Sequence, residues 1–87
     1  MNAPFKQEAF KLGKAKIYMH PTEQVLMIDA EGLKAAQRVN QVRHGRLLGQ
    51  HWWQFVFLFF SYTTTLGKDE GNSLKTWLER NNIEITR

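Results

Sequence analysis

The stretch His51-Trp-Trp-Gln-Phe-Val-Phe-Leu-Phe-Phe-Ser-Tyr-Thr-Thr-Thr65 decides how this 87-residue chain can fold. It holds two of the three tryptophans and four of the six phenylalanines, and Gln54 is the one polar residue between Trp52 and Phe60. Aromatic and β-branched side chains pack well on a pleated surface. A short apolar run can also be a buried helix, but this composition favours a strand over 51–65.

Both faces of the predicted strand are apolar. With a period of two, one face carries Trp53, Phe55, Phe57 and Phe59, and the other carries Trp52, Val56, Leu58, Phe60 and Tyr62. Such a strand lies at the centre of a sheet that is covered on both sides. We therefore expect a core that includes Phe55, Phe57, Leu58 and Trp77. So short a chain has few residues with which to cover both apolar faces of this strand. We therefore also expect a homodimer in which the remaining apolar surface is packed against a second copy.

A membrane span is the competing interpretation of this stretch. A span needs about 20 apolar residues, whereas Gly49, His51 and Gln54 interrupt this one. The N-terminus lacks the apolar core and small-residue cleavage site of a signal peptide. We therefore expect no membrane partner. The absence of cysteine excludes disulfides and suits a reducing cytoplasm, which is the expected location.

The pattern of the whole chain predicts an α+β fold in a small single domain over 1–87, with the order (α)ββαβαβ. We expect a mostly antiparallel sheet, with the aromatic strand at its centre and two helices packed on it. The other predicted elements are an N-terminal segment over 1–13 with helical spacing, a β-hairpin over 15–28, a basic helix over 30–44, a second helix over 73–81 and a terminal strand over 83–86.

Local signals support these boundaries. In the hairpin, Pro21 suits the second position of a type I turn. The alternation of apolar residues favours a loop of odd length, which would place Ile17 and Met27 on the same face. For the basic helix, Asp29 is a suitable N-cap and the pair His44-Gly45 is a suitable end.

The net charge of +4 lies entirely in the middle of the chain. Residues 1–31 hold four lysines and four acids, and residues 68–87 hold four bases and four acids. The middle holds no acid and four bases: Lys34, Arg38, Arg43 and Arg46. Cations without interspersed acids are what a phosphate backbone selects, because each contact releases condensed counterions. These four residues are the predicted nucleic-acid-binding residues, although a merely solvated face would look the same.

Trp52, Trp53 and Gln54 follow the basic segment directly and are the predicted interaction surface. An exposed tryptophan there could stack on a base or anchor a protein partner. The leading prediction is therefore a small binding module, not an enzyme, that engages an anionic partner, most readily nucleic acid. The alternative is a small regulator or inhibitor that binds an acidic protein through its aromatic surface.

Catalytic and metal chemistry find little support in the sequence. The three histidines show no metal-ligand spacing, and no cysteine is present to complete a zinc set. No glycine-rich phosphate loop or serine nucleophile motif occurs. A metal-independent ribonuclease could draw on His44, His51, Arg43, Arg46 and Tyr62, but nothing in their spacing requires it. We expect no metal and no cofactor.

Overall fold

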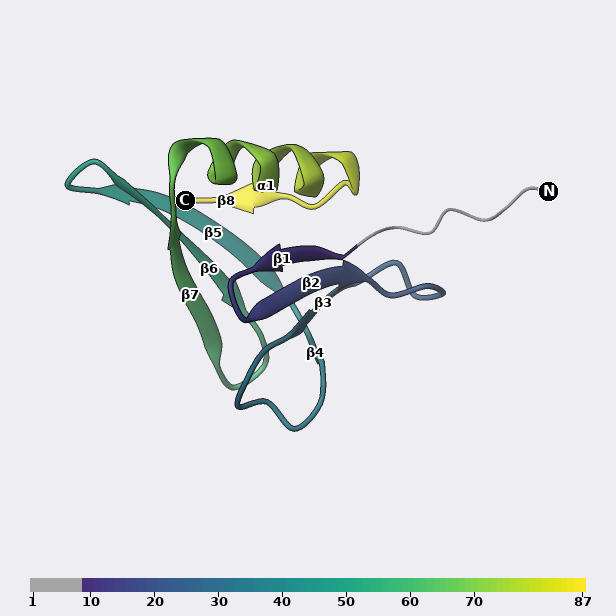
Figure 1. Cartoon of the computed structure of the whole chain (residues 1–87). Helices are drawn as coiled ribbons and strands as arrows, with labels where there is room; N and C mark the ends of the chain where they lie inside the picture. Colours follow the sequence, from purple (N-terminus) through teal and green to yellow (C-terminus); the bar gives the residue numbers. More distant parts are fainter. Residues whose placement is uncertain (1–8) are drawn as a thin grey trace.

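The computed structural model describes residues 9–87, which form two four-stranded sheets and one helix (Figure 1). The first sheet has the order β1-β2-β3-β4, with β1 at Phe10–Leu12, β2 at Ala15–Met19, β3 at Leu26–Asp29 and β4 at Gln37–Arg38. The second has the order β7-β6-β5-β8, with β5 at Gln41–Leu47, β6 at Gln50–Val56, β7 at Ser61–Leu66 and β8 at Ile85–Thr86. The helix α1 spans Lys68–Arg80.

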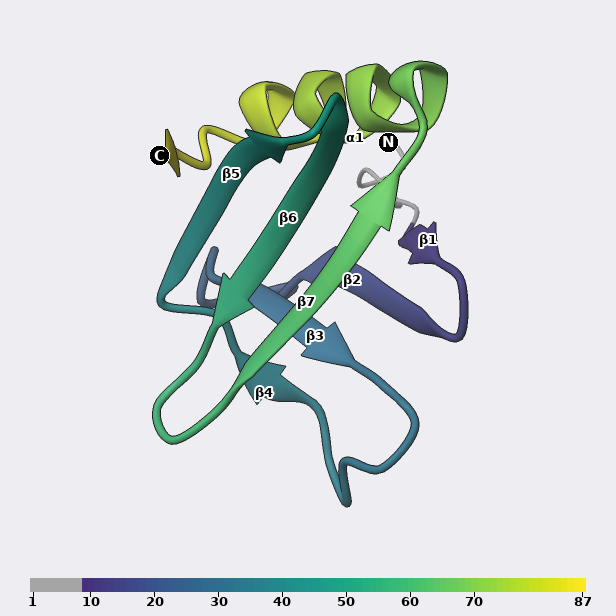
Figure 2. The same cartoon turned by 90° about the vertical axis from the view of Figure 1, so that its left-hand side faces the viewer.

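The core lies where the two sheets and α1 meet. Figure 2 shows the strands of the first sheet crossing behind those of the second, with α1 along one end. A single cluster of buried side chains combines both sheets and the helix, and its most enclosed members include Ile17, Ile28, Val42, Phe55, Leu74 and Leu78. The predicted fold of one central sheet with two helices is therefore wrong.

The β2–β3 hairpin lies where it was predicted, but its register differs. Ile17 pairs with Ile28 and Met19 with Leu26 in an antiparallel ladder. The loop over 20–25 is therefore even in length, and the prediction of an odd loop is wrong. With this register Ile17, Leu26 and Ile28 all face the core, at 2% exposure or less. Packing between the sheets thus selects the register, because a slip of one residue would turn one arm outward.

The predicted basic helix over 30–44 is absent. The chain there is a loop followed by β4 and the start of β5. Two backbone hydrogen bonds hold it extended: Val39 N–H donates to the carbonyl of Leu26, and Asn40 N–H donates to the carbonyl of Val56. Val39 and Val42 are buried in these strands. Helix propensity is a weak preference, and here ladder pairing and the packing of β-branched side chains override it.

The predicted strand over 51–65 is in fact two strands joined by a tight loop. β6 ends at Val56, β7 begins at Ser61, and the two pair antiparallel. Phe57 N–H donates to the carbonyl of Phe60 at 2.9 Å and closes the loop. A continuous strand of this length would extend about 50 Å, as long as the molecule's longest dimension of 48 Å. Folding back halves that length and pairs the backbone groups.

Because of this loop, some of the predicted core residues are buried and others are exposed. Phe55 and Phe57 are 0% and 4% exposed, which confirms their burial. Leu58 is 74% exposed, so its predicted burial is wrong. Trp77 is half-buried and packs against the core cluster.

The C-terminal part agrees best with the sequence. The helix predicted over 73–81 exists, buries Leu74 and Leu78, and ends at Arg80 with Asn81 as its C-cap. It begins earlier than predicted, at Lys68, with Asp69 and Glu70 in the first turn, where acidic side chains are favourable. β8 pairs parallel to β5 at the edge of its sheet and covers the last two residues of the terminal strand predicted over 83–86.

The N-terminal segment over 1–13 lies mostly outside the described residues. Within the described part, Phe10–Leu12 form β1, so the helical spacing does not produce a helix at these positions. The single helix of residues 9–87, α1, has 13 residues and is neither long nor apolar enough to cross a membrane.

Candidate functional site

The four predicted cations do not form one patch. Lys34 lies in the loop between β3 and β4, and Arg38 lies in β4. Arg43 and Arg46 both belong to β5, but an odd number of positions separates them, and successive side chains of a strand point to opposite faces. The structure therefore brings Arg43 and Arg46 to different sides of the second sheet.

Arg43 lies on what we call the outer face, the side of β5, β6 and β7 that points away from the core. Its positions include Gln41, Arg43, Gly45, Trp52, Gln54, Ser61, Thr63 and Thr65. The opposite side carries the buried Val42, Trp53 and Phe55. These three strands contain no aspartate or glutamate. The outer face of these three strands is therefore polar and cationic, with no carboxylate side chain on β5, β6 or β7.

Hydrogen bonds across the strands hold the Arg43 guanidinium. Arg43 Nη1 donates to Gln54 Oε1 at 3.1 Å, and Gln54 Nε2 donates to Ser61 Oγ at 3.2 Å. Within residues 9–87 the structure has one salt bridge, between Lys14 and Glu31. A guanidinium offers five N–H donors, so after its bond to Gln54 the Arg43 group still has donors for an anion.

The Trp52 ring packs against the same guanidinium group. Arg43 Cζ lies 5.9 Å from the centre of the ring, within the range of a cation–π contact. The indole lies against the backbone of Gly45, its neighbour across the ladder, where an added Cβ would collide with the ring. A glycine inside a strand often marks such a close approach. That signal was in the sequence, but the helix prediction assigned Gly45 to a helix end.

An open groove runs between the outer face and the loop 57–60, with a volume of about 630 Å³. Its polar lining consists of Gln41, Arg43, Gln54, Ser61 and Arg87, and its apolar lining consists of Val56 and Phe57–Phe60. Sequence reasoning missed Arg87, which the parallel pairing of Thr86 with Arg43 brings to this groove. It also missed the loop, whose Leu58, Phe59 and Phe60 are 74%, 81% and 69% exposed.

Trp53 is not part of this surface. It is 2% exposed and faces the core, where its Nε1 lacks a hydrogen-bond partner among the described residues. Gly71 of α1 packs beside that nitrogen. Of the three predicted interaction residues, the structure thus places Trp52 and Gln54 on the outer face and Trp53 beneath it.

His44 and His51 form a pair on the inner side of β5 and β6. His44 Nε2 and His51 Nδ1 are hydrogen-bonded at 2.9 Å, and the two rings are parallel. The His44 ring also stacks on Trp53, with 4.2 Å between ring centres. Burial lowers the pKa of His44, and the nearby cationic groups lower it further. No cluster of three metal-ligating side chains occurs in residues 9–87, so the pair has no third ligand there.

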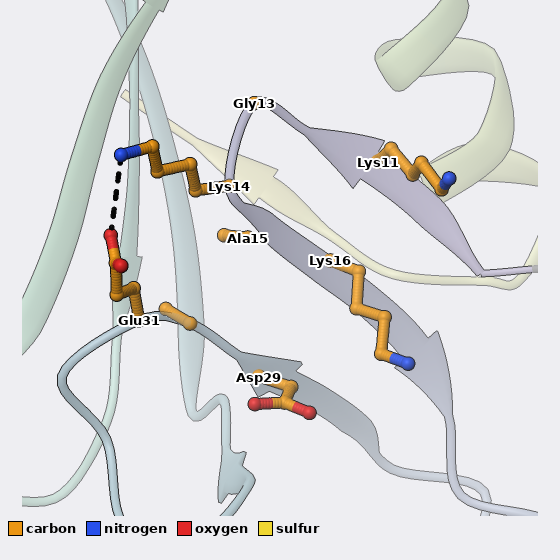
Figure 3. A pocket seen from close by; sticks show the side chains of 8 residues that line it. Lys11, Gly13, Lys14, Ala15, Lys16, Asp29 and Glu31 are labelled. Carbon is orange, nitrogen blue, oxygen red and sulfur yellow. Dashed lines mark ion pairs between the residues drawn. The ribbon is translucent and has the colours of Figure 1, made fainter.

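Two other grooves are lined by cationic side chains. One, near the start of α1, is lined by Arg46, His51 and Lys68, but the first turn of that helix carries Asp69 and Glu70. The other lies along β1 and β2, and Figure 3 shows Lys14 facing Glu31, while Lys11 points away from both carboxylates. There Lys14 Nζ lies 3.5 Å from Glu31 Oε1, and Lys16 sits across the ladder from Asp29. The neutralised lysines of this groove favour an anionic partner less than the outer face does, and the groove near α1 lacks, among the described residues, the exposed phenylalanine rings of the outer-face groove.

The outer-face groove is therefore the candidate site. Its cations come from β5 and the C-terminus, its amide and hydroxyl groups from β5, β6 and β7, and its exposed aromatic rings from the loop 57–60. Compared with known proteins, the chain matches no protein-family model, no curated protein and no solved structure.

Proposed function

We propose that this protein is a non-enzymatic binding module that holds nucleic acid on the outer face of its second sheet. The observation that carries the proposal is the Arg43 guanidinium, held by Gln54 and Trp52 in a groove that Arg87 also lines. Arginine is suited to phosphate because its planar donors can bind two oxygens at once. Amide and hydroxyl groups beside it can serve sugars or base edges.

The remaining cations would act at longer range. Lys34 and Arg38 are exposed, and the loop before β4 lies at the same end of the molecule as the loop after β6 (Figures 1 and 2). Their charge would raise the local concentration of an anionic polymer without contacting it specifically. The absence of cysteine fits a cytoplasmic setting for this binding, which belongs to the same proposal.

The test compares two arginines of one strand. Arg43→Gln and Arg46→Gln remove the same charge from opposite faces of β5, so Arg46→Gln is a matched control. Fluorescence anisotropy with a labelled oligonucleotide, repeated over a salt series, gives the slope of log affinity against log salt. We expect Arg43→Gln to weaken binding and to reduce the slope by about 0.7–0.9, the value of one phosphate contact. Arg46→Gln should keep the parent slope.

Two results would count against this function. The parent protein could fail to bind any oligonucleotide at low salt, which would remove the proposal altogether. Alternatively, the two variants could lose affinity equally, which would mean that net charge, and not the outer face, determines binding.

The second candidate is a regulator that acts through protein contact. The observation that favours it is the exposure of Leu58, Phe59 and Phe60 at one end of the second sheet and of Leu47 and Leu48 at the other. Exposed apolar groups in sequence are typical of contact surfaces. The partner would be an acidic protein or a second copy of this chain. Sedimentation equilibrium distinguishes a monomer of 10.2 kDa from the homodimer.

A further inference from the structure

We infer that the nucleic acid bound by the outer-face groove is single-stranded, and that Phe59 and Phe60 are the platforms on which its unpaired bases stack. The inference rests on the proposed function and specifies its ligand. It follows from the exposure of these two rings, their place beside the arginines and the hydrogen-bonding groups between them.

The loop 57–60 presents its rings to solvent on a fixed support. Phe57 is buried in the core, and its N–H donates to the carbonyl of Phe60, so the loop is anchored at both ends. Asn40 N–H also donates to the carbonyl of Val56, which ties the end of β6 to the segment before β5. Phe59 and Phe60 nevertheless remain 81% and 69% exposed. A supported, exposed aromatic ring is suited to stacking, because little freedom is lost when a flat partner covers it.

The groove places these rings next to the phosphate-binding groups. Arg43 and Arg87 line it together with Phe59 and Phe60. A strand with a phosphate at Arg43 would therefore have its bases within reach of the loop. Sites for single strands combine these two features, a cationic groove that follows the backbone and aromatic side chains that stack on the bases.

A duplex fits this groove poorly. Its bases are already paired and stacked in its interior, so exposed phenylalanines would meet only the backbone or the groove edges. The described arginines of the groove are also few, whereas a duplex is held mainly by many phosphate contacts. Phe59 and Phe60 would then stack on no base of a bound duplex.

An apolar ligand in the outer-face groove would leave the polar side chains of the groove without hydrogen-bond partners. Gln41, Gln54 and Ser61 lie in the same groove. An acyl chain or an apolar protein surface laid over them would bury their amides and hydroxyl, and the cost of burying such groups is high unless they are hydrogen-bonded. Nucleotides carry donors and acceptors on phosphate, sugar and base, so they can satisfy these groups while the bases cover the rings.

The experiment measures the affinity of the full chain for three probes: a single-stranded oligonucleotide of about 12 residues, a duplex of equal length, and vesicles of anionic phospholipid. The variants are Phe59→Ala, Phe60→Ala and the aromatic replacement Phe59→Trp. Leu47→Ala is the matched control, since it truncates an exposed apolar side chain at the opposite end of the sheet. Thermal unfolding of each variant checks that the fold is retained.

We expect the parent to prefer the single strand to the duplex. Each alanine variant should weaken single-strand binding about 5- to 150-fold, the range for loss of one stacked base. Phe59→Trp should retain affinity, and Leu47→Ala should behave as the parent does.

The results that would contradict this inference can be distinguished from those that would contradict nucleic-acid binding itself. Equal affinity for single strand and duplex, unchanged by Phe59→Ala, would overturn the stacking inference and leave nucleic-acid binding in place. No binding to either nucleic acid would overturn both. Binding to vesicles that Phe59→Ala abolishes, with no binding to oligonucleotides, would assign the loop to a lipid surface and would also overturn both.

Discussion

His44 couples the stability of this fold to pH. Its ring lies between those of His51 and Trp53, and its pKa is lowered first by burial and then by His51, Lys75, Arg87 and Arg46. The folded state therefore favours the neutral ring, whereas the unfolded chain takes up a proton near the ordinary pKa of histidine, about 6.5. When the pH falls below that value the unfolded state binds more protons, so the folded state loses stability.

Denaturant unfolding should therefore show a free energy of unfolding that decreases between about pH 7 and pH 5, above the range in which carboxylates protonate. His44→Gln removes the titrating ring and should show a smaller decrease over the same interval. The variant serves as its own control at neutral pH, where it reports the lost stacking on Trp53 and the lost hydrogen bond to His51. An identical decrease in parent and variant would show that His44 is not the group responsible.

Among the structural elements, the loop 57–60 has one side chain in the core and three in solvent. Phe57→Ala should destabilise the protein by about 3–5 kcal/mol, because it leaves a cavity among the buried side chains. Phe59→Ala, two positions away, should change stability by no more than about 0.5 kcal/mol, since its ring is exposed. Urea unfolding of both variants makes the comparison. Similar losses at the two positions would contradict the loop described above.

Elements with local signals could be predicted from the sequence. Helix α1 has Leu74 and Leu78 at helical spacing and Asn81 at its end, and the β2–β3 hairpin has Pro21 in its loop. The split between β6 and β7 has no such signal, because the loop 57–60 contains neither glycine nor proline. Typical strand lengths, about 3–10 residues, were the one indication that a strand over 51–65 was too long.

The β5–β6 turn was missed for a different reason. Leu48 and Gly49 both have positive φ values, of 53° and 81°, as a type I′ turn requires. Asparagine or aspartate is common at the first of these positions, whereas leucine is rare there. With the turn unrecognised, residues 41–44 were assigned to the end of the helix predicted over 30–44, and Arg43 and Arg46 were placed on one surface.

At the scale of the whole molecule, the charge pattern located part of the candidate site but not its geometry. The acid-free middle of the chain does contain Arg43, Trp52 and Gln54, which meet on the outer face. Arg87 reaches the groove only because β8 pairs with β5, a contact between distant parts of the chain. Such long-range pairing depends on the whole fold, so local sequence patterns could not specify it.

The outer face is most directly tested by nitrogen-15 NMR of the full chain titrated with a single-stranded oligonucleotide. The Trp52 ring lies on the outer face beside Arg43, and Trp53 lies in the core, so the two indole N–H signals form an internal comparison. We predict that Trp52, the side-chain amide of Gln54 and the backbone of 58–60 shift with a common binding curve, while Trp53 and Arg46 change little. Shifts centred on Arg46 and the start of α1, with Trp52 and 58–60 unmoved, would contradict the proposed site.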